Sequence, residues 1–360
     1  MMEVLNHLSA LLLLSLLPPS LSHVVGKFSE VKECSDFFLE GTTPNLPGIL
    51  VDGTVQDRKR YKPICQLFKY MKKKKVYNTY MFATLYDTTN KIPVFSAYTF
   101  TGVGSSERRP DTWMIEPQLD GGQDPDMSLE KDGVTYTHQA VNQDFHNSVN
   151  LTGLNKGHLF PKSYANQPAN QNSTFTLTNC VPQVQSFNDG SWGTMERKVR
   201  KVLLKQCLDN AGKPKAYVVT GAAPSESNTL KNRVNIPDLL WTAYCCYNNK
   251  QRQWVAEAHW GENKKDEKNV KGKKTTTTTT LASKTLADLY EMLNQYYGQG
   301  VKVFPDYCQN RKQDDTGRNG EAGAGQKRHG EISGESKGSI KKPRKTGDEE
   351  NDCDFDCDEE

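Results

Sequence analysis

The 360-residue sequence lacks several features that would place it in a common class of protein. It contains neither a CxxC pair nor an HExxH motif, which are the usual signatures of structural zinc sites and of zinc hydrolases. Its formal net charge is only +3, so no overall field marks a polyanion as its partner. Beyond residue 22 it has no apolar run long enough to cross a membrane. Function must therefore be sought in local motifs.

Composition divides the chain into a folded part and a tail. The hydrophobic share of 35% is low enough to indicate that part of the chain does not pack into a core. Residues 309–360 contain almost no aromatic side chains and are first basic, with "KKPRK", and then acidic, with "DEENDCDFDCDEE". We expect this tail to be disordered. Residues 23–308 remain as one predicted folded domain.

Residues 1–22 have the pattern of a secretory signal peptide. The apolar run "LSALLLLSLLPPSLS" is short and interrupted by prolines, and it ends in Ser20 and Ser22 at the spacing that a signal peptidase reads. An N-terminal membrane anchor is the alternative interpretation. We expect a secreted, extracellular protein with no membrane span in the mature chain, and this argues against nuclear import through "KKPRK".

The cysteines fit an oxidising compartment, where several of them should pair into disulfides. Seven precede the tail, so at least one is left over. The seven are Cys34, Cys65, Cys180, Cys207, Cys245, Cys246 and Cys308. A zinc site is a poor interpretation, because Cys245 and Cys246 are adjacent.

Strands and helices alternate without a regular βαβ rhythm, which predicts an α+β fold. Residues 79–100 form two aromatic and β-branched runs around a polar turn, a hairpin in which Pro93 marks an edge or a strand start. The other predicted strands are "STFTLTN" ending at Asn179, "KAYVVTGAA" ending at Gly221, and the hairpin formed by "LLWTAYCCY" and "RQWVAEAHW". Helices are predicted from about Ser186 to Leu208 and in "SKTLADLYEMLNQYYG", with Ser283 as N-cap and Gly298 as the stop.

Chemistry is concentrated in residues 151–199. In a helix that begins near Ser186, Asn188, Trp192 and Glu196 stand at i, i+4 and i+8 and share one face. Trp192 should anchor that face in the core and leave Asn188 and Glu196 pointing into a shared site. His158 lies upstream in a short extended segment, after Gly157, which permits a close backbone approach or a sharp turn.

This set suits phosphodiester hydrolysis. An amide oxygen such as that of Asn188 is a hard, neutral ligand that fits Mg²⁺, an ion that keeps most of its waters. A neutral His158 beside it can take a proton from water. A polar surface segment is the simpler explanation when spacing alone is considered.

Three motifs in this region together resemble the DNA/RNA non-specific endonuclease family, the ββα-metal (His-Me finger) nucleases. That family shows Asp-Arg-Gly-His, then a strand ending in Ser-Asn-x-x-Pro-Gln, then a helix with Asn-x-x-x-Trp-x-x-x-Glu. Here the positions read Asn155-Lys156-Gly157-His158, then Thr178-Asn179-Cys180-Val181-Pro182-Gln183, then Asn188, Trp192 and Glu196. "VVTGAAP" and "VNIPDLLWTAYCC" are similar to two further strands of the family.

The resemblance implies a central, mostly antiparallel sheet flanked by helices, and Mg²⁺-dependent cleavage of DNA and/or RNA with little sequence specificity, with another divalent cation as an alternative. The implied roles are general base for His158, metal ligand for Asn188 and orientation of metal-bound water for Glu196. Asn179 and Gln183 would support the site or contact phosphate.

Two positions depart from the family pattern. Asn155 replaces an aspartate and loses its charge, and Lys156 replaces an arginine and loses the bidentate fork for phosphate. The protein should recognise a nucleic acid by contacts to its phosphate backbone rather than to base edges. Four basic residues near the site could hold that backbone, although a solvated helix face is the simpler explanation for each. They are Lys162, Arg197, Lys198 and Lys201.

Two other functions remain open at this stage. The first is a secreted nucleic-acid-binding protein whose catalysis is weakened or lost through the changes at Asn155 and Lys156. The second is a zinc hydrolase that uses His138, His146 and His158. A metal-dependent plasmid-nicking assay separates all three.

Overall fold

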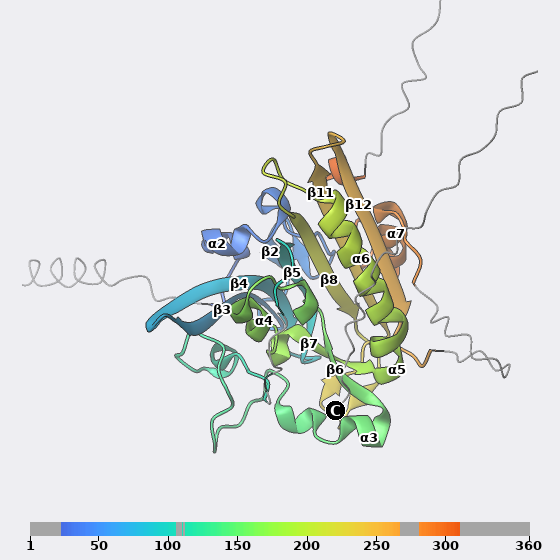
Figure 1. Cartoon of the computed structure of the whole chain (residues 1–360). Helices are drawn as coiled ribbons and strands as arrows, with labels where there is room; N and C mark the ends of the chain where they lie inside the picture. The colour runs from blue at the N-terminus through green and yellow to red at the C-terminus, as the bar shows by residue number, and fades with distance from the viewer. Residues whose placement is uncertain (1–22, 106–109, 111, 267–280, 310–360) are drawn as a thin grey trace, which may run out of the picture. The chain divides into compact units, whose positions relative to one another are not determined.

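A computed structural model of the chain describes residues 23–105, 110, 112–266 and 281–309 (Figure 1). The predicted signal peptide and the predicted tail beyond Gln309 lie outside these described residues. The strands are β1 (Leu50–Val51), β2 (Thr54–Val55), β3 (Tyr61–Lys72), β4 (Lys75–Asp87), β5 (Ile92–Phe100), β6 (Leu154–His158), β7 (Cys180–Val184), β8 (Ala216–Ala223), β9 (Thr229–Leu230), β10 (Val234–Asn235), β11 (Leu239–Asn248) and β12 (Gln253–Glu262). The α-helices are α2 (Lys32–Ser35), α3 (Ser148–Thr152), α4 (Pro168–Ser173), α5 (Gln185–Phe187), α6 (Gly193–Gln206) and α7 (Leu286–Tyr297).

Six strands form one sheet in the order β12-β11-β8-β5-β4-β3, and every neighbouring pair is antiparallel. This confirms the predicted α+β class with a central antiparallel sheet. The predicted hairpin over residues 79–100 is β4–β5, and Pro93 is the second residue of β5. Since β5 also pairs with β8, Pro93 marks a strand start rather than a sheet edge.

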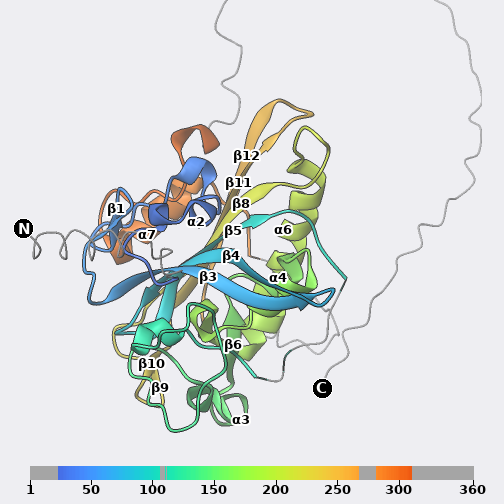
Figure 2. The same ribbon diagram turned by 90° about the vertical axis from the view of Figure 1, so that its left-hand side faces the viewer.

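Both faces of the sheet are covered, as Figure 2 shows. One hydrophobic cluster joins the sheet to β6, β7 and α6, and a second cluster joins its other face to α2 and α7. Successive residues of a strand point to opposite faces. Tyr244 of β11 therefore lies in the first cluster, while its neighbour Ala243 lies in the second. No helix among the described residues combines the length and apolar character needed to span a membrane.

The adjacent cysteines of β11 fasten both layers to the same strand. Cys246 faces the first cluster and is bonded to Cys207 at the end of α6. Cys245 faces the second cluster and is bonded to Cys308, which follows α7. Six of the seven cysteines thus pair, because Cys34 and Cys65 form the third disulfide.

The remaining cysteine, Cys180, is buried and unbonded. Burial raises the pKa of its thiol to about 12, which keeps the group protonated and unreactive. It stands on β7 directly opposite His158 of β6. One unpaired cysteine among the seven agrees with the odd number in the sequence.

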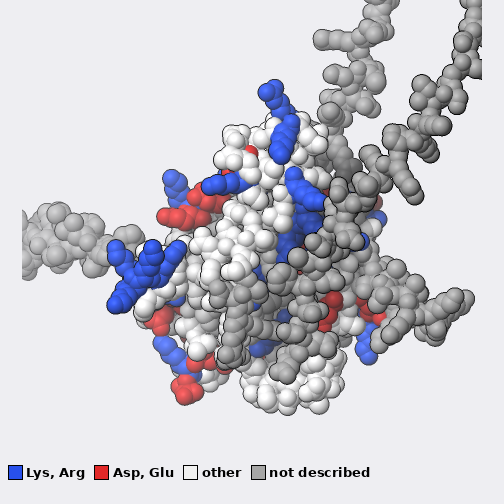
Figure 3. Space-filling model, in the orientation of Figure 1, with Lys and Arg blue, Asp and Glu red and all other residues white. Residues whose placement is uncertain are grey.

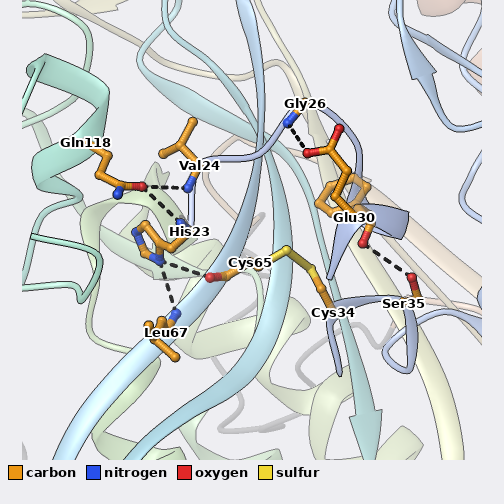
Figure 4. Close-up of a disulfide and its surroundings, with 10 residues drawn as sticks. His23, Val24, Gly26, Glu30, Cys34, Ser35, Cys65, Leu67 and Gln118 are labelled. Atoms are coloured by element: carbon orange, nitrogen blue, oxygen red, sulfur yellow. Dashed lines mark hydrogen bonds between the residues drawn. A yellow bond between two sulfur atoms is a disulfide. The ribbon is translucent and has the colours of Figure 1, made fainter. Parts of the chain in front are cut away.

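The beginning of the described chain is held against β3 beside the Cys34–Cys65 disulfide (Figure 4). His23 is fully buried, and its Nδ1 lies 2.9 Å from the Cys65 carbonyl oxygen. Gln118 accepts hydrogen bonds from the backbone N–H groups of His23 and Val24 at 3.0 and 2.9 Å. These contacts join residues 23 and 24 to β3 and to the 3-10 turn that contains Gln118.

Three predicted boundaries are wrong. "STFTLTN" is not a strand: it ends in a short 3-10 turn, Leu177–Asn179, and the strand begins at Cys180. Its Thr and Asn side chains bond to nearby backbone groups, which competes with strand pairing; Thr174, for example, donates to the Gln171 carbonyl. The strand in "KAYVVTGAA" ends at Ala223, two residues beyond the predicted end.

The last helix begins later than predicted. Thr285, not Ser283, is the N-cap of α7, because its side chain accepts from the Asp288 N–H while Asp288 bonds back to the Thr285 N–H. Gly298 ends the helix as predicted. The helix predicted from about Ser186 to Leu208 is helical from Gln185 to Gln206, but it is interrupted by a wider turn at Asn188–Trp192 with a kink at Gly190.

Candidate active site

A strand–strand–helix module carries the residues predicted for the site, except Asn179, which lies in the 3-10 turn just before β7. β6 carries Asn155–His158, and the antiparallel strand β7 places Gln183 directly opposite Asn155. α5, a π-type turn (Asn188–Trp192) and α6 follow directly in sequence, with a kink at Gly190, whose backbone is not helical. Asn188 begins the π-type turn, and Glu196 lies in the first turn of α6. In Figure 1 β6, β7 and α5 lie near one another in the lower part of the molecule, and α6 runs upward from there along β8, β11 and β12.

His158 is half-buried at the end of β6, between two aromatic rings. Its ring centroid lies 4.6 Å from that of Trp113 and 4.8 Å from that of Phe175, whose plane is perpendicular to the imidazole. Both aromatic side chains are themselves buried. The rings therefore restrict the orientation of the imidazole, whose Nε2 atom is buried.

Asn179 is fully buried and fixes the chain that leaves His158. Its Oδ1 accepts from the Ser96 hydroxyl and the Phe160 N–H, both at 2.9 Å. Its Nδ2 donates to the carbonyls of Phe160 and Thr174. All four hydrogen-bonding positions of the amide are used, so of the two roles implied for Asn179, support of the site fits this position.

Gly157 allows a close approach that no other residue permits. A Cβ at this position would lie 2.0 Å from Oε1 and 2.7 Å from Cβ of Gln183 on the facing strand. Gln183 is fully buried, and neither atom of its amide group has a hydrogen-bond partner among the described residues. The Gln183 side chain therefore lies over the Gly157 backbone, one residue before His158.

Asn188 is oriented by the first residue of the β6 motif. Its Nδ2 donates to Oδ1 of Asn155 at 3.2 Å. Within the described part of the chain its Oδ1 accepts no hydrogen bond, so this oxygen is the free end of a positioned amide. The carbonyl of Asn188 accepts from Gly193 five residues later, and a Cβ on Gly193 would come within 2.8 Å of it. A single neutral oxygen of this kind fits Mg²⁺ chemically.

Trp192 and Glu196 confirm the predicted i, i+4 relationship. Trp192 is buried in the core, and its Nε1 donates to Oε1 of Glu196 at 3.0 Å. Burial raises the pKa of the Glu196 carboxyl to about 7, although the Trp192 hydrogen bond and the charges of Arg197 and Arg200 lower it. Glu196 is therefore a carboxyl group that changes charge near neutral pH.

Lys156 points along the same side of β6 as His158. Its Nζ donates to Oδ1 of Asn142 at 2.9 Å and lies 5.4 Å from the centre of the Trp113 ring and 5.6 Å from that of Phe145. Trp113 thus contacts both the imidazole and the ammonium group. The Lys156 ammonium group, which stands where the family has an arginine, is therefore held by the Asn142 amide and the rings of Trp113 and Phe145.

The predicted basic residues differ in exposure. Arg197 donates to the Thr194 hydroxyl at 2.8 Å. Arg197, Lys198 and Lys201 are exposed on α6, whereas Lys162 is half-buried in the turn that follows His158.

Sequence inspection missed the residues that hold the site from outside the module. Trp113 and Phe175 enclose His158, and Asn142 binds Lys156. None belongs to a local motif, and Trp113 lies 45 positions before His158. Only the tertiary fold brings these side chains together.

A zinc site built on histidines finds no support in the described residues. No group of three or more His, Cys, Asp or Glu side chains among them is placed to hold a metal ion. The His138 side chain is 57% exposed and pairs with Asp120, while His158 lies between its two rings.

Two antiparallel strands followed by a helix, with a histidine ending the first strand and an asparagine near the start of the helix, form the arrangement of the ββα-metal class. The chain belongs to the DNA/RNA non-specific endonuclease family, whose model matches residues 66–287.

The curated relatives include proteins called endonuclease domain-containing 1. The human protein (Homo sapiens) is 32% identical over 226 residues, and the mouse protein (Mus musculus) is 33% identical over 227 residues. Each match covers 59% of this chain but only 39% of the human and 38% of the mouse protein, so the chain spans well under half of these relatives.

A more distant relative and a solved structure also match. A nuclease of Nostoc sp. is 30% identical over 91 residues, which are 25% of this chain and 31% of that protein. The solved structure of the EndoG/EndoGI complex aligns with a TM-score of 0.40 at 17% identity, over 68% of this chain and 86% of that one.

Proposed function

We propose that the protein is a secreted, metal-dependent endonuclease that hydrolyses phosphodiester bonds of DNA and/or RNA with little sequence specificity. One observation carries the proposal: the Asn188 side-chain N–H donates to Oδ1 of Asn155 at 3.2 Å. Asn155 lies on β6, the strand that also carries Lys156 and ends at His158. A candidate metal ligand and a candidate base are thereby built into one rigid module.

His158 is the general base in this proposal. Its imidazole takes a proton from a water molecule, and that water attacks the phosphorus while the bond to the leaving sugar oxygen breaks. Trp113 and Phe175 support this role because they fix the direction of the ring. Proton transfer depends on such alignment, and a freely rotating imidazole would lose much of the rate.

Asn188 would hold Mg²⁺ through its amide oxygen, and another divalent cation would bind in the same way. When bound, the ion neutralises charge on the phosphate and on the leaving oxygen. Asn155 contributes by orienting the Asn188 amide. Glu196, whose carboxyl pKa is raised to about 7 by burial, would accept a hydrogen bond from a water molecule in the site.

Lys156 would contact a phosphate oxygen as a point charge, since an ammonium group lacks the planar fork of arginine. Asn179 would act by support alone. Gln183 is buried without a hydrogen-bond partner among the described residues, an arrangement that typically costs about 1–3 kcal/mol of stability. Such a cost supports a role for Gln183 in the site rather than in folding.

Secretion is part of the proposal. Three disulfides join distant elements, and such bonds persist in oxidising compartments. Detection of a mature chain that begins near His23 in the culture medium of expressing cells would support secretion, and retention of an uncleaved chain in the cells would contradict it.

Nicking of supercoiled plasmid tests the enzymatic function. Purified protein with Mg²⁺ should convert the plasmid to open-circle and linear forms, and EDTA should stop the reaction. A parallel reaction with single-stranded RNA defines the substrate range. Binding of nucleic acid without any cleavage, under all divalent ions tested, would instead establish the alternative of a nucleic-acid-binding protein that has lost catalysis.

A further inference from the structure

The longest hairpin of the fold ends in a strongly basic tip. β3 and β4 pair from the sheet outward to Tyr70 opposite Tyr77, Met71 opposite Val76, and Lys72 opposite Lys75. Lys73 and Lys74 form the two-residue turn, with φ values of +49° and +64°. We call residues 69–78 the basic arm. Figure 1 shows it extending beyond the rest of the sheet, and Figure 3 shows Lys and Arg side chains gathered at its end.

The charges at the tip of the arm, Lys72–Lys75, have no acidic partner within the described part of the chain. Lys72–Lys75 are all exposed, and none of the ion pairs formed within the described residues involves them. Lys72 and Lys75 stand directly opposite each other, where like charges destabilise a strand pair. Four adjacent positive charges at one tip form a local field that the net charge of +3 conceals.

The turn itself is made from residues that disfavour it. A two-residue hairpin turn with positive φ at both positions is most stable with Asn-Gly. Lysine adopts positive φ only at a conformational cost. Lys73 and Lys74 therefore occupy turn positions at which Asn and Gly would give a more stable turn. Conflicts between a local rule and the sequence are expected at functional positions.

One face of the arm carries a row of aromatic rings. Phe68 stacks on Tyr70 with ring centroids 6.3 Å apart, and Tyr70 stacks on Tyr77 at 5.5 Å. Phe68 and Tyr70 also pack against the hydrophobic cluster that contains β6, β7 and α6. Because strand residues two apart share a face, Lys72 and Lys75 continue this row on the side of the sheet that bears the candidate active site.

We propose that the basic arm binds the phosphate backbone of a nucleic acid at a distance from the cleavage site. Lysines supply charge for phosphates, and the exposed edge of the aromatic row offers a surface for sugars or unstacked bases. The ligand is the substrate class of the proposed nuclease, so the proposal rests on that function for its biological meaning. Binding itself does not require catalysis and can be measured without it.

The test removes charge while keeping the turn. The variant Lys73→Asn, Lys74→Gly installs the preferred turn residues, and the fuller variant adds Lys72→Gln and Lys75→Gln. A matched control removes two charges from the exposed tip of the β11–β12 hairpin, with Lys250→Gln and Arg252→Asn. Equilibrium binding to labelled duplex DNA and to RNA of the same sequence is measured in EDTA by fluorescence anisotropy over a range of salt concentrations.

The fuller variant should bind at least about tenfold more weakly near 0.1 M salt, and the slope of log affinity against log salt should become shallower by about 3. The two-charge turn variant should show roughly half of that change in slope, and the control should match wild type. Equal affinity and slope in wild type and both arm variants would overturn the proposal, and so would absence of binding by wild type.

The same preparations distinguish the arm from the nuclease function. If wild type cleaves with Mg²⁺ but arm variants bind normally, the arm assignment is wrong and the nuclease stands. If no preparation cleaves but the arm variants lose binding, the arm assignment stands and the proposed nuclease function is wrong.

Vesicles containing phosphatidylserine test whether the arm binds a membrane surface instead, since Met71 and Val76 at its tip are exposed. Vesicle binding that depends on the arm lysines, without any effect of those lysines on nucleic-acid binding, would overturn the proposal in favour of a membrane surface.

Discussion

The side-chain N–H of Asn188 donates to the side-chain oxygen of Asn155 at 3.2 Å, which joins the helix of the ββα module to its first strand. The bond fixes which end of the Asn188 amide is offered to the site. In the family pattern an aspartate stands at position 155. Asparagine preserves the acceptor for Asn188 but removes a negative charge from the first strand of the module. The departure therefore keeps the geometry while it changes the electrostatics.

The first prediction concerns His158. His158→Ala should reduce cleavage by about 10²–10⁴, the usual loss for a general base. The half-buried ring lies between Trp113 and Phe175, so its removal leaves a small gap and should lower the melting temperature only slightly. Single-turnover cleavage and thermal melts of the purified variant provide both values. A folded variant that cuts at the wild-type rate would remove His158 from the mechanism.

The second prediction concerns Lys156. Lys156→Arg should equal or exceed wild-type kcat/KM, by up to about fivefold, because the guanidinium offers a second charge-assisted hydrogen bond to phosphate and stacks on Trp113. Lys156→Met, which keeps length and packing without charge, should fall below wild type. Steady-state cleavage rates of the three proteins give the comparison. A strong loss in Lys156→Arg would show that the bond to Asn142 matters more than phosphate contact.

The third prediction concerns Gly157 and Gln183. Gly157→Ala should destabilise the fold by about 1–3 kcal/mol, because the new methyl group would overlap the Gln183 side chain. Gln183→Gly removes the obstacle, so Gly157→Ala should cost clearly less in that background. Urea denaturation of both single variants and the double variant measures the coupling. Strictly additive losses would mean that another contact explains the glycine.

The fourth prediction concerns the pH dependence of stability. Burial raises the pKa of Glu196 from 4.5 to about 7 in the folded protein. Between those two values the folded state retains a proton that the unfolded state has released, so the contribution of Glu196 makes the protein less stable as pH rises and reaches its full penalty above about pH 7. Glu196→Gln stays neutral and keeps an acceptor for the Trp192 N–H.

The stability of Glu196→Gln relative to wild type should therefore increase between pH 5 and pH 8, by roughly 2 kcal/mol after allowance for partial solvent contact. Denaturant midpoints at the two pH values measure this difference. The same variant should lose cleavage activity if the carboxylate orients water. A stability difference that does not vary with pH would contradict the raised pKa.

Local sequence patterns were sufficient for the parts of the site that depend on short-range geometry. The i, i+4 spacing of Trp192 and Glu196 predicted a shared helix face, and a hydrogen bond joins the two side chains. Two aromatic and β-branched runs around a polar turn likewise predicted the β4–β5 hairpin. These features follow from the period of a helix or a strand, which a short segment contains in full.

Other features depend on the whole chain and carried no local signal. Trp113 reaches His158 only because the fold returns an irregular segment to the module. The pairing of Cys245 with Cys308 and of Cys246 with Cys207 depends on which face of β11 each residue occupies and on what covers that face. The side-chain bonds around Asn179 replaced a predicted strand by a turn, because buried amide and hydroxyl groups must find partners wherever the fold supplies them.

Metal dependence of Asn188→Ala tests the central claim most directly. The substitution removes the proposed ligand and the bond to Asn155, while Trp192 and the core beneath it remain. The variant should melt close to wild type and still bind nucleic acid. A single neutral ligand holds a divalent ion weakly, so binding of Mg²⁺ by wild type without substrate should also be weak.

The decisive measurement is the cleavage rate against Mg²⁺ concentration for wild type and Asn188→Ala. Wild type should show a saturable dependence that EDTA abolishes at once, whereas Asn188→Ala should remain inactive or require far more Mg²⁺. Full wild-type activity in EDTA, or the same Mg²⁺ dependence in both proteins, would contradict a mechanism in which Asn188 holds a single metal ion beside His158.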